Sequence, residues 1–293
     1  GSLPDSQLAL ERIYGYSGNG VKNNLHYLSY GMIYSVGKVL VRSDLQDDKQ
    51  EFFFASSKIT CLSVHHKKSI CAIGQEESPP DITIVNLSTM QPLSFLSWNA
   101  KGLICLDFDD SGSYVVSVGN SQEIVVHDWK NGAEIASCRT YGLETLDVKF
   151  LKGSTNRLVE CGRCFVRFWR FAGCSLCAAG DEVRLNSVEN HTQYYSCLGW
   201  NGDNLLVGTS TGQVIQFEEN EPHKRINAHQ SAVTNISCAN DGFVTSSDDG
   251  FKHWSSEMRC ILSIYTQDLG TKHHIRSICW ATDMIIIGTS GDE

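Results

Sequence analysis

The chain has 293 residues, of which 19% are charged and 41% hydrophobic, and its formal net charge is −9. This length suits one large all-β domain or two smaller ones, and the hydrophobic share argues against extensive disorder. The negative charge argues against nucleic acid as a partner, and no run approaches the roughly 20 apolar residues of a membrane-spanning helix.

The cysteines indicate a reducing compartment. There are 12, and many lie inside apolar runs, where cysteine behaves as a small buried hydrophobic residue. No signal peptide opens the chain, so we expect a cytoplasmic protein. Gly1 and Ser2 look like a vector-derived remnant, and we assign residues 1–7 to this remnant and a linker.

Strand-like segments recur along the chain with a regular spacing. The first strands of the repeats are expected at 59–64, 103–108, 145–150, 196–200, 233–237 and 275–280, and their anchor residues lie 38 to 50 positions apart. The anchors are Leu62, Leu106, Val148, Leu198, Ile236 and Ile278. A period of 20 to 50 residues is typical of solenoids and propellers.

Each first strand is followed by a turn and a second apolar strand that ends in small residues, such as "YVVSVG" or "LLVGTS". A third strand such as "EIVVHDW" or "QVIQF" comes next, and then a weaker fourth segment. Four short strands per repeat are the signature of a WD40 β-propeller, in which sheets packed radially cover each other's faces. The alternative is a large β-sandwich, which does not require this repeated strand order.

One repeat, residues 228–254, keeps the fullest WD pattern: "AHQSAVTNISCANDGFVTSSDDGFKHW". The residues that match the hydrogen-bonded side-chain series of such repeats are His229, Ser246 or Ser247, Asp248 or Asp249, and Trp254. A catalytic Ser-His-Asp set would use the same residue types. Because these positions follow the repeat, we predict a structural role for them.

Two Cys-x-x-Cys pairs, Cys161/Cys164 and Cys174/Cys177, resemble the ligand set of a zinc ribbon. The segment between them reads as the third strand of a repeat. Eight extended residues span about 26 Å, so the pairs should lie at opposite ends of this strand and bind no metal.

"GTSTG" at 208–212 satisfies the G-x-S-x-G pattern of hydrolases, but a strand follows it where that motif requires a helix. We therefore predict a turn between two strands, and no catalytic residue or cofactor.

Basic residues cluster in two segments that we expect to be loops on one face of the propeller. The first segment contains His223, Lys224 and Arg225, and the second contains Lys272, His273 and Arg276. They form a candidate partner-binding patch, although ordinary solvated loop charges are the alternative.

The N-terminal stretch from Leu8, "LALERIYGYSGNGVKNNLHYLSYGMIYSVGKVLVRSDL", resembles the HELP motif of the echinoderm microtubule-associated protein-like (EMAP-like) family. The matching residues are Glu11, Tyr14, Gly15, Tyr16, Gly18, Asn24, Leu25, Gly31 and Tyr34. The repeats continue the resemblance to about Thr289. It implies the first propeller of a tandem-propeller protein that is not an enzyme and that binds tubulin and microtubules.

We therefore expect an all-β, seven-bladed WD40-type propeller with the HELP motif integrated into one blade. Residues 8–57 would form the HELP motif and its blade strands, and residues 58–293 the WD40 repeats, the last of them incomplete. The expected partner is tubulin or microtubules in the cytoplasmic cytoskeleton, together with other proteins bound through propeller loops, and no membrane. The alternative is a general WD40 scaffold, such as a ciliary or ubiquitin-pathway adaptor, whose partner is not tubulin.

Overall fold

The computed structural model describes residues 10–18, 20–29, 31–76, 82–97, 102–140, 144–180, 182–184, 193–239, 241–270, 274–281 and 284–290. Within these ranges the regular elements are β-strands and two short 3-10 helices, η1 (His66–Lys68) and η2 (Thr266–Leu269). None of the helices in these ranges is long and apolar enough to cross a membrane.

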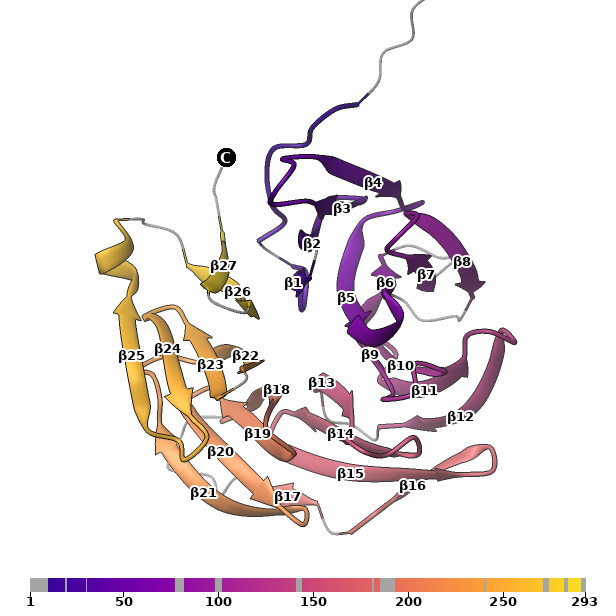
Figure 1. Ribbon diagram of the computed structural model, residues 1–293. Helices are drawn as coiled ribbons and strands as arrows, with labels where there is room; N and C mark the ends of the chain where they lie inside the picture. Colours follow the sequence, from indigo (N-terminus) through magenta and orange to yellow (C-terminus); the bar gives the residue numbers. More distant parts are fainter. Residues whose placement is uncertain are drawn as a thin grey trace, which may run out of the picture.

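The strands form antiparallel sheets arranged around a central axis, with the first strand of each sheet nearest the axis (Figure 1). The first sheet contains β1 (Leu25–Leu28), β2 (Gly31–Val36), β3 (Val39–Ser43) and β4 (Gln50–Phe54). The second contains β5 (Ile59–His65), β6 (Ile70–Gln75), β7 (Ile82–Asn86) and β8 (Gln91–Leu96). This architecture is a β-propeller, and the all-β prediction is confirmed.

The next two repeats are joined into one nine-stranded sheet. Its first half contains β9 (Leu103–Phe108), β10 (Tyr114–Gly119), β11 (Glu123–Asp128) and β12 (Ala133–Arg139). Its second half contains β13 (Thr145–Phe150), β14 (Arg157–Gly162), β15 (Phe165–Ala172), β16 (Ser175–Ala178) and β17 (Val183–Arg184). The halves meet where the outer strands β12 and β16 pair in parallel at Ser137 and Ser175.

Three sheets complete the described part. One contains β18 (Tyr195–Asn201), β19 (Asn204–Thr209), β20 (Gln213–Glu218) and β21 (Glu221–Asn227). The next contains β22 (Val233–Ala239), β23 (Gly242–Ser247), β24 (Gly250–Ser255) and β25 (Cys260–Tyr265). The last has two strands, β26 (Ile275–Ala281) and β27 (Met284–Thr289).

Burial explains why the second strands of the repeats read as continuous apolar runs. Every residue of β6 and β23 is buried, whereas the outer strand β21 is exposed along almost its whole length. A middle strand that is covered on both faces by neighbouring sheets has no solvent side, so its sequence does not alternate. The core lies between the sheets: Ile33 and Leu40 of the first sheet pack with Leu62 and Ile73 of the second.

Side chains near the axis link neighbouring inner strands. Asp107 of β9 accepts a hydrogen bond from the backbone N–H of Phe150 in β13 at 2.9 Å. Asp147 of β13 accepts one from the N–H of Leu198 in β18, also at 2.9 Å. These bonds satisfy inner-strand N–H groups that the sheet ladder leaves free and couple neighbouring sheets.

The N-terminal segment lies between the first and last sheets, where the ring closes. The N–H of Lys22 donates to the carbonyl of Thr60 at 3.0 Å, and a parallel bridge joins residue 22 to β5. At the other end of the segment, the Tyr16 ring packs against Gly288 of β27, where a Cβ would lie 2.4 Å from Tyr16 Cζ. Strand β1 lies beside β26 (Figure 1), so the first and last sheets are neighbours.

The strands predicted around the two Cys-x-x-Cys pairs are confirmed. Cys164 lies in the turn before β15 and Cys174 in the turn after it, so the pairs occupy opposite ends of that strand. Gly208–Gly212 covers the end of β19 and its turn into β20, as predicted.

Candidate functional site

The residues of the HELP-like segment divide into buried and exposed groups. Asn24 is fully buried, and its Nδ2 donates to the carbonyl of Ser17 at 2.8 Å. Its Oδ1 accepts from both the N–H and the hydroxyl of Ser35 at 2.7 Å. Asn24 therefore ties the N-terminal segment to β2.

Tyr16, also from this segment, is largely buried, and this burial raises the pKa of its phenol to about 12. Glu11, Tyr14 and Gly15 are exposed, Tyr14 to 83%. They are therefore available for contacts outside this chain, whereas Tyr16 and Asn24 hold the segment in place.

The WD-type residues of the β22–β25 sheet form a continuous hydrogen-bonded series. Asp249 Oδ1 lies 2.7 Å from His229 Nδ1, and His229 Nε2 lies 2.8 Å from the hydroxyl of Thr245. Trp254 Nε1 donates to the same hydroxyl at 2.9 Å. Burial lowers the pKa of His229 despite the nearby carboxylate, so the ring is neutral at physiological pH.

The hydroxyl in this series comes from Thr245, whereas the sequence suggested Ser246 or Ser247. The Ser246 hydroxyl bonds that of Thr234, and the Ser247 hydroxyl bonds that of Ser231. Asp248 points toward the next sheet, where it lies 3.4 Å from Arg276 and 3.2 Å from His274 Nδ1. Of the two candidate aspartates, Asp249 therefore holds His229.

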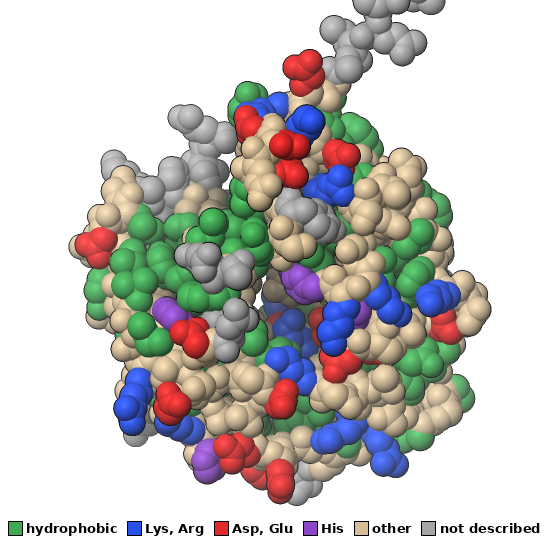
Figure 2. All heavy atoms as spheres, viewed as in Figure 1, with side chains coloured by type: hydrophobic (Ala, Val, Ile, Leu, Met, Phe, Trp, Pro, Cys, Tyr) green, Lys and Arg blue, Asp and Glu red, His purple; other side chains and the backbone are tan. Residues whose placement is uncertain are grey.

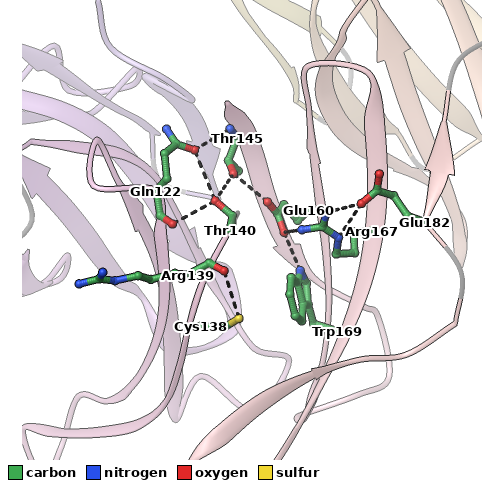
Figure 3. A network of polar contacts seen from close by, with 9 residues as sticks. All are labelled: Gln122, Cys138, Arg139, Thr140, Thr145, Glu160, Arg167, Trp169 and Glu182. Carbon is green, nitrogen blue, oxygen red and sulfur yellow. Dashed lines mark hydrogen bonds and ion pairs between the residues drawn. The ribbon is translucent and has the colours of Figure 1, made fainter. Parts of the chain in front are cut away.

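A second network occupies the equivalent place in the β13–β16 half-sheet (Figure 3). The carboxylate of Glu160, a fully buried residue, accepts from Trp169 Nε1 at 2.6 Å and from the Thr145 hydroxyl at 2.7 Å. Arg167 lies 4.0 Å from the same carboxylate and also pairs with Glu182. Burial raises the pKa of Glu160, and its hydrogen bonds partly oppose that shift.

Thr245 and Glu160 are not among the residues expected from the sequence, although their spacing carries a signal. Each lies nine positions before the tryptophan that donates to it. In the β9–β12 half-sheet, His127 Nε2 lies 3.1 Å from the hydroxyl of Ser117, ten positions earlier. A side-chain hydrogen bond between the second and third strands therefore recurs in three repeats, each time with a different residue pair.

The basic segments are placed differently from the expectation. His223, Lys224 and Arg225 lie on the outer strand β21, where the sequence suggested a loop. Arg276 belongs to the inner strand β26 and lies beside Asp248. Lys272 and His273 lie outside the described residues. A single patch that joins the two segments stays a prediction.

A cavity of about 610 Å³ opens at the axis, on the face that carries the turns between first and second strands. Figure 2 shows a hollow near the centre of the ring, with basic and histidine side chains at its margin. Asp107 and Lys149 line it 3.8 Å apart, and both side chains are more than four-fifths buried. Burial raises the pKa of Asp107 to about 6; burial alone would lower the pKa of Lys149, but Asp107 and Asp147 raise it.

Aromatic side chains form much of the cavity wall. Trp200 and Trp280 come from the inner strands β18 and β26, and Lys152 Nζ lies 5.6 Å from the centre of the Trp200 ring. His26 lines the cavity from β1, and burial lowers its pKa to about 3, so this histidine is neutral.

Metal ligation and thiol chemistry are both disfavoured among the described residues. Across the residues that the structure describes, no group of three or more His, Cys, Asp or Glu side chains could hold a metal ion. Burial raises the pKa of the Cys61 and Cys197 thiols to about 12, which disfavours the nucleophilic thiolate.

Comparison with known proteins gives consistent matches. The family model described as "Echinoderm microtubule-associated protein first beta-propeller" matches residues 49–293. Echinoderm microtubule-associated protein-like 4 of Homo sapiens is 26% identical over 324 aligned positions, which cover 98% of this chain and 32% of that protein. Echinoderm microtubule-associated protein-like 1 of Rattus norvegicus is 26% identical, covering 83% of this chain and 32% of that protein. The chain therefore spans about a third of the length of these relatives.

A solved structure described as that of U3-55K superposes with a TM-score of 0.68. It is 13% identical and covers 89% of this chain and 85% of that chain. At this identity the match concerns the fold alone.

Proposed function

Because this chain belongs to the echinoderm microtubule-associated protein-like family, we propose that it is a non-catalytic module that binds tubulin or microtubules within a cytoskeletal scaffold. The observation that carries this proposal is the family match over residues 49–293, which covers strands β4 to β27 of the propeller. The names of the relatives describe microtubule-associated proteins, and a cytoplasmic location on the cytoskeleton follows from the same reasoning.

We further propose that the ring has seven blades. The four four-stranded sheets would be four of them, the halves of the nine-stranded sheet two more, and β26–β27 the first two strands of the seventh. Residues 8–57, with the HELP-like residues Tyr16 and Asn24, would supply the β1–β4 blade and its closing segment. The packing of Tyr16 on Gly288 and the bonds of Asn24 support this assignment.

The proposal is tested by mixing the purified chain with isolated tubulin heterodimer. Complex formation is measured by co-sedimentation or size-exclusion chromatography at low and high salt. We expect binding that weakens as salt rises, because an acidic protein must contact acidic tubulin through local basic groups. A lack of binding at low salt would contradict direct tubulin association. A lysate pull-down in which a protein other than tubulin dominates would favour the general scaffold.

A further inference from the structure

The axial cavity is lined by polar side chains that could contact a bound molecule. We infer that its mouth binds an acidic, extended polypeptide segment, whose carboxylates pair with Lys67 and Lys152 and whose backbone lies against Trp200 and Trp280. This inference adds the chemistry of the partner to the proposed function. Its assignment of the acidic segment to a cytoskeletal partner rests on the proposed function.

The carboxylates of Asp107 and Asp109 already have hydrogen-bond or ion-pair partners within the chain. Asp109 is fully buried and accepts hydrogen bonds from the backbone N–H groups of Ser111, Ser113 and Tyr114. The Asp107 carboxylate accepts from Phe150 and faces Lys149. Carboxylates that are satisfied internally do not repel an incoming anion as strongly as free ones.

The donors at the mouth are less fully used. Lys67 and Lys152 line the cavity and are exposed; one N–H of Lys152 Nζ donates to the carbonyl of Gly202 at 2.6 Å, and an ammonium group has three donors. Trp280 Nε1 is buried without a hydrogen-bond partner, although an indole N–H is a donor only and costs stability when unpaired. The Trp280 ring packs against the His253 ring of β24, with 4.5 Å between the ring centres, and also lines the cavity.

The wall has the composition of a recognition site. Four inner strands place an aromatic residue against the cavity, and tryptophan is enriched among the residues that dominate binding energy. These residues are Phe108, Phe150, Trp200 and Trp280. A cavity of about 610 Å³ falls within the range of ligand-binding pockets. It would hold a few residues of an extended chain and leave the flanking residues to reach Lys67 and Lys152.

The test uses a fluorescein-labelled peptide of about twelve residues that alternates Glu and Gly, long enough to cross the mouth when extended. Its binding to the chain is followed by fluorescence anisotropy at low and high salt. A Lys-Gly peptide of the same length and an oligothymidylate of similar charge serve as competing probes. The variants are Lys67→Gln/Lys152→Gln and Trp280→Phe. Lys38→Gln/Lys130→Gln, at two exposed residues outside the cavity, is the matched control with the same change in charge.

We expect the Glu-Gly peptide to bind and the Lys-Gly peptide not to bind. The mouth double variant should weaken binding about fivefold, in line with two exposed ion pairs. Trp280→Phe should weaken it about threefold to tenfold because the smaller ring leaves less aromatic surface in the cavity wall, while the Lys38→Gln/Lys130→Gln control should leave it unchanged. Circular dichroism melts establish that each variant is folded.

Three results would overturn the inference: no binding of the Glu-Gly peptide, an equal loss in the Lys38→Gln/Lys130→Gln control, or tighter binding of the oligothymidylate. The proposed function can fail separately. If tubulin binds and the peptide does not, the cavity is not the contact but the family function stands. If the peptide binds at the mouth and tubulin does not, the site stands and its partner is a different acidic protein.

Discussion

Substituting Gly288 by alanine tests how the ring is closed. Gly288 lies near the end of β27, and Tyr16 of the N-terminal segment packs directly on it. An alanine Cβ at this position would lie 2.4 Å from Tyr16 Cζ, 2.5 Å from its Oη and 2.6 Å from its Cε1. The backbone of residue 288 is not in the left-handed region, so the effect of the substitution would come from this contact.

The size of the effect follows from the overlap. Non-bonded heavy atoms normally lie about 3.5–4.0 Å apart, so the Tyr16 ring would have to move by about 1 Å. Overpacking of this kind costs about 1–3 kcal/mol. The stability of Gly288→Ala should fall by that amount, and its Tm by about 2–4 °C for each kcal/mol.

Urea unfolding of Gly288→Ala, Tyr16→Ala and the double variant measures the coupling between the two sites. Without the Tyr16 ring the new methyl group has room, so the penalty of Gly288→Ala should shrink by about 1 kcal/mol or more. Gly208→Ala is the matched control, because Gly208 holds the equivalent place in β19 and its Cβ would meet Cys197 and Val233. An equal cost of Gly288→Ala with and without the Tyr16 ring would refute the proposed closure.

Three further predictions concern buried polar groups and thiols. Glu160→Ala should lower the free energy of unfolding by about 2–4 kcal/mol, because it leaves the Trp169 N–H unpaired, whereas Glu160→Gln should cost much less; urea unfolding distinguishes them. His26 is held neutral with a pKa of about 3 by burial and, less strongly, by His66 and Lys149. The unfolded chain binds a proton there below pH 6.5, so stability should fall by up to about 1.4 kcal/mol per pH unit between pH 6.5 and 3; His26→Phe should flatten that slope. Thiol labelling at mildly alkaline pH should modify the exposed cysteines quickly and the buried ones only on unfolding, and fast labelling of the buried set would contradict the burial. The exposed set is Cys174, Cys177, Cys238 and Cys260, and the buried set is Cys61, Cys71, Cys105, Cys161, Cys197 and Cys279.

The propeller could be predicted because its strands carry a repeated physical signature. Middle strands such as β6 and β23 are covered on both faces, so their apolar runs stand out against the turns that bound them. The strand at β15 was predictable for the same reason, and its length separated the two cysteine pairs. The resemblance to the EMAP-like family is confirmed by the family match.

The details of the polar networks were harder to predict, because they depend on which neighbouring side chain is within reach. "TSS" offers three hydroxyls in a row. Alternation along β23 turns only Ser246 to the other face, and the position of Thr245 along the strand places it within reach of Trp254 and His229. The basic stretch 223–225 was read as a loop because outer strands face solvent and carry polar sequences, as β21 does. The axial cavity combines residues from distant repeats, so a linear pattern does not reveal it.

The closing segment also has a consequence for how the protein is made. Tyr16 is synthesised long before its partner Gly288. Lys22 is likewise synthesised before its partner strand β5. During synthesis Tyr16 must therefore stay uncovered until β27 has emerged. Contacts of such long sequence separation form slowly and leave apolar surface exposed in the meantime. We expect the nascent propeller to depend on chaperones until β27 arrives, and mutations at this seam to lower the yield of soluble protein more than its melting temperature.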